Sequence, residues 1–356
     1  MKKQTTYNYF IDLLKFVFSV IIVFYHSWVF TGEYGLGFFN HGYLAVDFYF
    51  IVTGYLMMQS ISKEKESKEC LGIQTLKFTF KKIANLFPYV LFSFILGCLL
   101  IYKREIFSLS LITSNNLISE ILQIGVLGLG YPINGATWYL SSMIIVLMCL
   151  YPLAKKYKKN YPTLVVPLLL SLVLCLVYSS GMIINDPANK VLFGLNGLYK
   201  GFIFILLGNI SYSLVSLFDK VEFTKCGKIF LTILEFILLF LLVTTMHYNL
   251  FGTIVVALLT LLLVTLVFSG KSYTQTMFNF PFLKKLGFFG FVMYLNNVYL
   301  RVPLLNSGLE LSYKEYVLLF LGITVAISLL AYYLVPLVVK IIKKILEFIK
   351  RKFIIN

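Results

Sequence analysis

Ionisable side chains inside an apolar stretch are the features of this sequence best suited to chemistry. Asp12, Lys15, Ser19 and His26 all lie in the apolar run 8–30. Lys15 precedes His26 by almost three turns of an α-helix, so both fall on one helix face, about 16 Å apart along the axis. Charged groups inside a membrane are costly and usually face a protein interior or a wet cavity. We therefore expect a site along this face. The alternative is a packing face, with His26 hydrogen-bonded to a neighbouring helix.

The chemistry that these residues favour is proton transfer. A His kept neutral in a low-dielectric site is suited to that task, so we predict that His26 is a general base. Asp47, in the next apolar run 41–59, is expected at a similar depth because the two helices run antiparallel. We predict that Asp47 orients the imidazole; alternatively it caps its own helix. Lys15 is predicted to bind an anionic donor or to pair with Asp12.

Composition indicates the elements that must position these groups. The chain has 356 residues, of which 59% are hydrophobic, 17% aromatic and 13% charged, and its mean hydropathy is +0.87. These values exclude an ordinary soluble domain and are typical of a polytopic membrane protein. About 20 apolar residues span a bilayer as a helix. The sequence therefore predicts an all-α membrane protein with ten spans, near 8–30, 41–59, 84–102, 136–153, 162–180, 198–217, 229–247, 250–269, 286–304 and 315–340.

The distribution of basic residues predicts the orientation of the chain. With the N-terminus in the cytoplasm, 24 of the 31 Lys and Arg residues fall on the inner side. Membrane proteins concentrate basic residues in cytoplasmic segments, so we expect both termini inside and the loop 103–135 outside. The same bias accounts for the net charge of +16 without a nucleic-acid partner. We divide the chain into a membrane domain over 1–345 and a basic cytoplasmic tail over 346–356, in a multi-pass protein of the cell membrane.

Further candidate residues lie near the two membrane faces. Basic and aromatic residues alternate in the predicted cytoplasmic loop 60–86, and we expect Lys77, Lys81 and Lys82 there to bind a soluble anionic cofactor. Attraction to anionic lipid headgroups is the alternative. Three further residues are candidates for substrate binding: Trp138, Asn296 and Asn297. For Trp138 the alternative is an aromatic belt, and the paired amides need partners inside a span. Five scattered Cys without CxxC spacing indicate neither disulfides nor a metal site.

Together these stretches resemble the acyltransferase type 3 family of membrane proteins, over nearly the whole chain. Lys15, ten residues and then His26 fit the basic-x10-His signature of that family. The run from Gly42 to Leu56, which reads Gly-x-x-x-Val-Asp-Phe-x-Phe-x-x-x-Gly-Tyr-Leu, fits its second hallmark. Weaker matches are 137–140 and 286–295.

The resemblance implies transfer of an acyl group, most often acetyl, from acyl-CoA to a hydroxyl of a surface polysaccharide or lipid-linked sugar, without a metal. His26 would be the essential residue and Lys15 its basic partner. The chain departs from the family at two places. An Arg-x-x-Arg pair reads Lys82 and Asn85, which puts tight phosphate binding there in question. A late Tyr-Leu-x-His pattern ends in Asn297, so the role of that His is lost or passed to an amide.

Two other functions remain open at this point. One is a transporter or flippase for a glycan lipid, in which the intramembrane charges line a pathway. The other is a non-catalytic scaffold for glycan assembly. A transporter would keep its transport after substitution of His26 by Gln, and a scaffold would show no chemistry.

Overall fold

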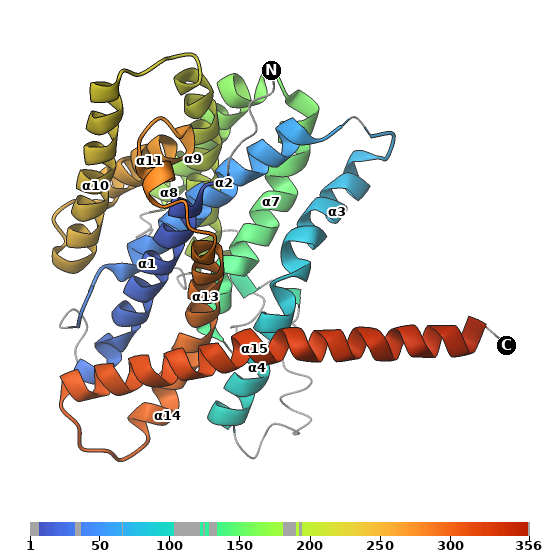
Figure 1. Cartoon of the computed structure of the whole chain (residues 1–356), viewed down its shortest axis with the longest axis vertical. Helices are drawn as coiled ribbons and strands as arrows, with labels where there is room; N and C mark the ends of the chain where they lie inside the picture. The colour runs from blue at the N-terminus through green and yellow to red at the C-terminus, as the bar shows by residue number, and fades with distance from the viewer. Residues whose placement is uncertain are drawn as a thin grey trace.

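The computed structural model describes residues 7–32, 37–65, 67–102, 122–123, 125–127, 134–180, 190–191 and 194–354. These residues are almost entirely helical (Figure 1). A two-stranded antiparallel pairing of β1 (Lys190–Val191) with β2 (Gly194–Leu195) is the exception. Eight helices are long and apolar enough to cross a membrane, or nine if a bent pair counts as one span. The prediction of an all-α multi-pass membrane protein is therefore confirmed.

The helices follow the predicted spans closely. In chain order they are α1 (Tyr9–His26), η1 (Ser27–Thr31), η2 (Gly42–Leu44), α2 (Ala45–Lys63), α3 (Leu71–Ala84), α4 (Phe87–Tyr102), η3 (Gly125–Leu127), η4 (Gly135–Thr137), α7 (Trp138–Tyr157), η5 (Tyr161–Val165), α8 (Val166–Ser179), α9 (Asn196–Phe218), α10 (Lys225–Tyr248), α11 (Thr253–Ser269), α12 (Thr274–Met277), α13 (Phe282–Asn297), η6 (Val298–Leu300), α14 (Arg301–Leu305) and α15 (Tyr313–Ile354). Each of the ten predicted spans contains one of these helices. The predicted outer loop 103–135 lies largely outside the described residues.

The loop predicted over residues 60–86 is wrong in its second half. Residues Leu71–Ala84 form α3, which meets α4 at a bend of 54°. The helix is amphipathic: Thr75, Phe78 and Thr79 are buried, whereas its lysines are exposed. Hydropathy alone misses such a helix because its charged face lowers the average.

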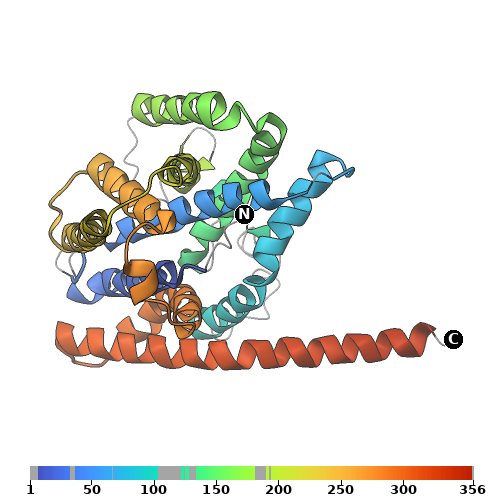
Figure 2. The same ribbon diagram turned by 45° about the horizontal axis from the view of Figure 1, so that its top comes forward.

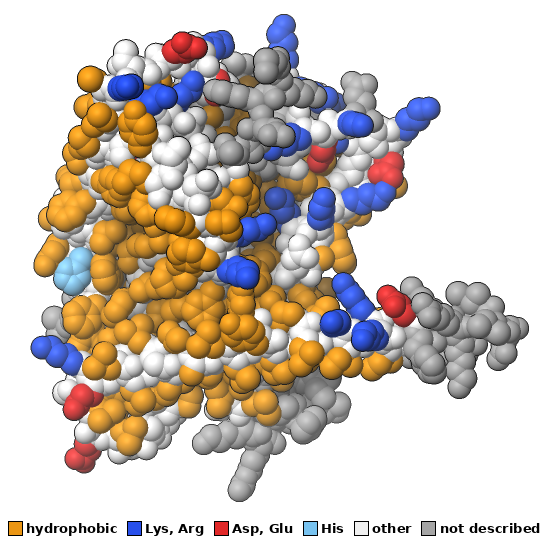
Figure 3. All heavy atoms as spheres, viewed as in Figure 1, with side chains coloured by type: hydrophobic (Ala, Val, Ile, Leu, Met, Phe, Trp, Pro, Cys, Tyr) orange, Lys and Arg blue, Asp and Glu red, His pale blue; other side chains and the backbone are white. Residues whose placement is uncertain are grey.

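The last helix is longer than the span predicted over 315–340. α15 continues unbroken to Ile354, so the predicted basic tail from residue 346 begins inside a helix. It lies across α13 and α4, and its C-terminal half projects beyond the other helices (Figures 1 and 2). Apolar side chains cover much of the face drawn in Figure 3, and Lys and Arg gather in its upper part and towards the free end of α15.

Four glycines set the helix contacts that position the site. A Cβ added at Gly54 of α2 would lie 2.1 Å from a backbone oxygen of α9, and one at Gly208 of α9 would lie 2.1 Å from a backbone oxygen of α2. Gly287 and Gly290 of α13 would likewise meet α1, at 2.7 and 3.0 Å. Small residues allow membrane helices to pack backbone against backbone. The result is that α1 packs along α13, and α2 packs along α9.

Candidate active site

From the orientation that the lysine distribution predicts, we call the C-terminal end of α1 its outer end and the N-terminal end its inner end. At the outer end, His26 lies against a single amide side chain. The Nδ1 atom of His26 lies 2.6 Å from Oδ1 of Asn297. The Nδ2 group of Asn297 donates to the backbone oxygens of Met293, at 3.2 Å, and Tyr294, at 2.7 Å. A reversed amide would bring its oxygen against both carbonyls, so Oδ1 must face the imidazole. Because Oδ1 only accepts hydrogen bonds, Nδ1 carries the hydrogen, and the neutral ring leaves Nε2 free as a base.

Helix packing brings these two residues together from opposite ends of the sequence. His26 is the last residue of α1, and Asn297 is the last residue of α13. The close contact of the two helices at Gly287 and Gly290 aligns their outer ends. Asn297 is fully buried and His26 is half-buried. The rigid partner fixes the ring, while the imidazole stays within reach of a ligand.

Asp47 does not make the predicted contact with His26. Its Oδ1 lies 2.8 Å from Nζ of Lys200 on α9, and both side chains are buried, at 0% and 2% exposure. Its Oδ2 has no hydrogen-bond partner among the residues that the structure describes. Since Asn297 bonds to Nδ1 of His26 and Asp47 pairs with Lys200, the structure shows no direct bond through which Asp47 would orient the imidazole, and a role of Asp47 at His26 stays a prediction. The ion pair instead joins α2 to α9.

Lys200 is a residue that the sequence reasoning missed. It lies at the beginning of the predicted span 198–217, close to the expected outer face. The rule that singled out Lys15, namely a charge inside an apolar run, would also have found it. The same rule applies to Glu235 of α10, which is fully buried and accepts a hydrogen bond of 2.6 Å from Thr274.

The inner end of α1 carries an ion pair and borders a cavity. Nζ of Lys15 lies 2.9 Å from Oδ1 of Asp12, so the predicted alternative of a pair one turn apart is confirmed. Both residues line a cavity of about 510 Å³. The other residues of its wall are Tyr7, Asn8, Ile11, Tyr55, Leu56, Gln59, Lys63, Val215, Asp219, Phe268, Ser269, Gly270 and Gln275. A polar cavity with two lysines is suited to an anionic ligand.

A layer of tyrosines lies between the two ends. The hydroxyl of Tyr49 donates to the backbone oxygen of Lys15 and accepts from Ser19 at 2.6 Å. Tyr294, three residues before Asn297, donates to the backbone oxygen of Ala136 at 2.6 Å. Together with Tyr139, Val46 and Phe291 these two tyrosines surround a void of only about 10 Å³. A void of this size has room for about one water molecule.

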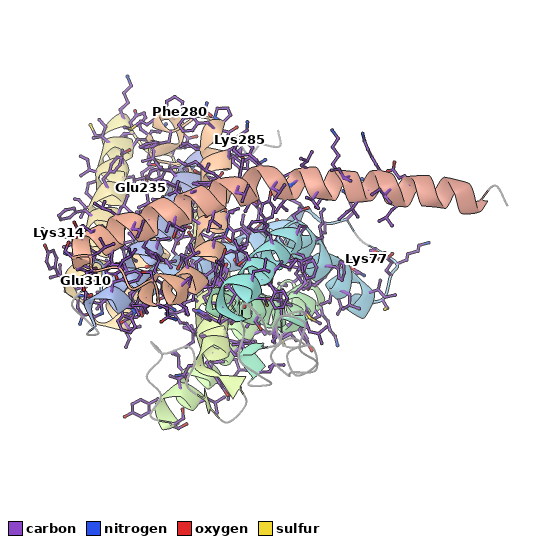
Figure 4. All side chains as sticks on the ribbon, turned by 90° about the horizontal axis from the view of Figure 1, so that it is seen from below. Lys77, Glu235, Phe280, Lys285, Glu310 and Lys314 are labelled. Carbon is purple, nitrogen blue, oxygen red and sulfur yellow. The ribbon has the colours of Figure 1, made fainter. Side chains whose placement is uncertain are left out.

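The three lysines predicted to bind a cofactor lie on α3, apart from the wall of this cavity. Lys77 is exposed, pairs with Glu69 and lies at the edge of the molecule (Figure 4). Lys81 is also exposed. Nζ of Lys82 lies 5.4 Å from the ring centre of Phe78, and its charge interacts with that of Lys15. Of the three, Lys82 is the one that the structure connects to the inner end of α1.

The candidate substrate-binding residues occupy different environments. Trp138 is half-buried; its ring centre lies 6.0 Å from that of Phe50. Asn296 is buried, with Nδ2 donating to the backbone oxygen of Val292 at 2.9 Å and Oδ1 accepting from Tyr299 at 2.7 Å. Only Asn297 of the three contacts His26. A role in substrate binding stays a prediction for all of them.

These features define a multi-pass helical membrane protein with an intramembrane histidine–amide pair and a polar cavity at opposite ends of one helix. The sequence model of the acyltransferase 3 family, described as an acyltransferase domain, matches residues 8–336. The chain belongs to this family, and membership suggests acyltransferase activity. No curated protein and no solved structure gives a significant match.

Proposed function

We propose that the protein transfers an acyl group, most simply acetyl, from acyl-CoA to a hydroxyl of a cell-surface polysaccharide or lipid-linked sugar. The reaction takes place in the cell membrane and needs no metal. The observation that carries the proposal is the hydrogen bond of 2.6 Å from Nδ1 of His26 to Asn297, since it leaves Nε2 as the basic atom. Family membership supplies the class of reaction.

The proposed step uses His26 as the general base. The acceptor oxygen attacks the thioester carbonyl carbon while Nε2 of His26 takes the hydroxyl proton. The tetrahedral intermediate collapses, the C–S bond breaks, and the CoA thiolate regains a proton from the imidazolium. Asn297 keeps accepting from Nδ1 throughout, so it holds the ring in one tautomer and one orientation. Because an amide carries no charge, it stabilises the imidazolium less than a carboxylate would.

The donor is proposed to enter from the inner end of α1. Coenzyme A carries phosphates, and Lys15 and Lys63 line the cavity of about 510 Å³ there. The rise of an α-helix separates Lys15 from His26 by about 16 Å along α1, a span that the flexible arm of the donor would have to cover. For the thioester to reach His26, the tyrosine layer at Tyr49 must open. Lys82 would add a further positive charge at the entrance, because it interacts with Lys15.

Substitution of His26 tests the proposal. The variant His26→Gln should neither release CoA from acyl-CoA nor acylate surface glycans. A thiol reagent measures the released CoA, and mass spectrometry measures the acylation. His247→Gln, on the peripheral helix α10, is the matched control and should keep both. Acyl transfer that survives in a well-folded His26→Gln protein would overturn the mechanism. If the protein transports a glycan lipid without any acyl transfer, the flippase is favoured. If it shows neither activity, the scaffold is favoured.

The proposed donor entry also requires a defined orientation of the chain. From the lysine distribution we expect Lys158 at the cytoplasmic face and the loop containing Asn115 outside. Single cysteines at these two positions can be treated with an impermeant thiol reagent on intact cells. Labelling is expected at position 115 alone. Labelling at position 158 alone would place the cavity on the outer side and contradict the proposed donor route.

A further inference from the structure

An arginine lies next to His26 without a carboxylate partner. α13, η6 and α14 follow one another without a break, and Arg301 is four residues beyond Asn297. Residues four apart share a helix face, so Arg301 lies one turn beyond the residue that contacts His26. α14 also packs against η1, the segment that begins directly after His26. Arg301 is accordingly close enough for its positive charge to act on the imidazole of His26.

The side chain of Arg301 makes one hydrogen bond to the residues that the structure describes. Its Nε group donates to the backbone oxygen of Val298 at 3.0 Å. Among the residues that the structure describes, no carboxylate lies within pairing distance of Arg301 and no hydrogen bond from its two terminal amino groups is found, while Tyr25 is the group whose charge acts on it. The carboxylate of Asp47, at the same end of the molecule, is already paired with Lys200. Arg301 is half-buried, so ligands can reach it while much of its surface is removed from water.

Three cations with low exposure in other helices are neutralised. Lys15, Lys155 and Lys200 each have a carboxylate oxygen within 2.9 Å, from Asp12, Glu64 and Asp47 respectively. A desolvated charge without a partner is unfavourable, and inside membranes such charges commonly mark substrate sites. The planar guanidinium group matches a carboxylate or a phosphate with two parallel hydrogen bonds. Arg301 therefore has the chemistry of an anion-binding residue beside the proposed base.

We propose that Arg301 binds an anionic group of the acceptor, so that the acceptor is an acidic sugar or a sugar phosphate. The anion bonds to the terminal amino groups of Arg301, and a neighbouring hydroxyl of the same acceptor faces Nε2 of His26. This inference rests on the proposed acyl transfer and specifies its substrate class. It makes Arg301 a specificity-determining residue, whereas the chemistry stays with His26.

Binding measurements on the full-length protein in nanodiscs test this inference separately from catalysis. The probes are glucuronic acid, glucose 6-phosphate and glucose, followed by saturation-transfer NMR. Wild type should prefer at least one anionic probe over glucose, and the two anionic probes distinguish a carboxylate from a phosphate. Arg301→Gln should raise the Kd of the preferred anion about tenfold or more, as expected for loss of charge-assisted hydrogen bonds, and leave glucose unchanged.

Three further variants keep the test decisive. Lys314→Gln removes an exposed cation at the beginning of α15 and should bind as wild type does (Figure 4). Arg301→Lys keeps the charge but not the two-pronged geometry, so it should bind the anion with intermediate affinity, and it decides the matter if Arg301→Gln does not fold. His26→Gln should keep the preference for the anionic probe over glucose, because the anion bonds to Arg301. Equal binding of glucose and both anions by wild type, or anion binding unaffected by either Arg301 variant, would overturn the anion site. Normal anion selectivity in a protein without acyl transfer would instead refute the proposed function alone.

Discussion

The two ends of α1 hold their ionisable residues in opposite ways. At the outer end, a neutral amide fixes His26 by one short hydrogen bond and leaves Nε2 free. At the inner end, Lys15 is paired with the carboxylate of Asp12 beside a cavity of about 510 Å³. A neutral partner preserves a base, whereas an ion pair keeps a cation charged and in place. In the proposed function, one helix thus separates proton transfer at His26 from binding of the acyl donor near Lys15.

A second pair at the outer end sharpens this contrast. Asp47 and Lys200 form an ion pair as buried as any in the described part of the chain, yet neither contacts His26. Lys200 is surrounded by the rings of Tyr43, at 5.5 Å, and Phe204, at 5.8 Å. The nearly fully buried charges of Asp47 and Lys200 therefore join two helices. His26 and Arg301 are half-buried, so ligands can reach them.

The largest effect is expected from breaking the Asp47–Lys200 pair. Asp47→Ala leaves Lys200 buried and unpaired, which should lower the free energy of unfolding by about 3–5 kcal/mol. Thermal unfolding of the detergent-purified protein measures this loss. The double variant Asp47→Leu with Lys200→Leu removes both charges and should recover much of the stability. A stable Asp47→Ala protein with reduced turnover would show instead that Asp47 acts in catalysis, as the sequence had suggested.

Removal of the Asn297 side chain should have the second-largest effect, a lower kcat. Asn297→Ala frees the imidazole to rotate and to change tautomer, and loss of orientation on this scale lowers kcat by about 10²-fold. The KM for acyl-CoA should stay near that of wild type, because the donor anions bind at the other end of α1. Asn297→His restores the residue usual at this place in the family pattern and should retain more activity than Asn297→Ala. Asn296→Ala is the matched control, and an equal loss of kcat there would argue against a specific role for Asn297.

Substitutions at the inner end of α1 should weaken binding of the acyl donor. Lys15→Ala removes one cation from the cavity wall and should raise the KM for acyl-CoA about tenfold while kcat at saturation changes little, which is the signature of lost uniform binding. Lys63→Ala, on the same wall, should act in the same direction. A fall in kcat with unchanged KM would show that Lys15 serves the chemical step, and the functional separation of the two ends would then fail.

The smallest effect is expected on α3. Replacement of Lys77, Lys81 and Lys82 by Gln should raise the KM for acyl-CoA only severalfold, since exposed charges interact weakly through water. Lys82→Gln alone should account for most of the change, because its charge reaches Lys15. Lys77→Gln is the internal control. An unaltered KM in the triple variant would assign this helix to lipid headgroups and limit the donor site to the cavity.

Several features followed from the sequence because they depend on neighbouring residues only. Apolar runs predicted the spans, and the helical repeat placed Lys15 and His26 on one face. The Lys15–Asp12 pair was also foreseeable, since one helical turn brings the two residues together. α3 was missed because hydropathy is averaged over a window of residues. In an amphipathic helix with a narrow apolar side, the polar residues lower that average.

The partners of the intramembrane charges were decided by tertiary structure. Asn297 is 271 residues from His26, and Lys200 is on α9 whereas Asp47 is on α2. Which side chains meet across such distances depends on the rotation and offset of packed helices, here set by close contacts at Gly54, Gly208, Gly287 and Gly290. No local pattern encodes those two quantities. The sequence therefore determined that an ionisable residue, His26, lies within an apolar helix, and only the packing of α13 against α1 gave that residue an amide partner.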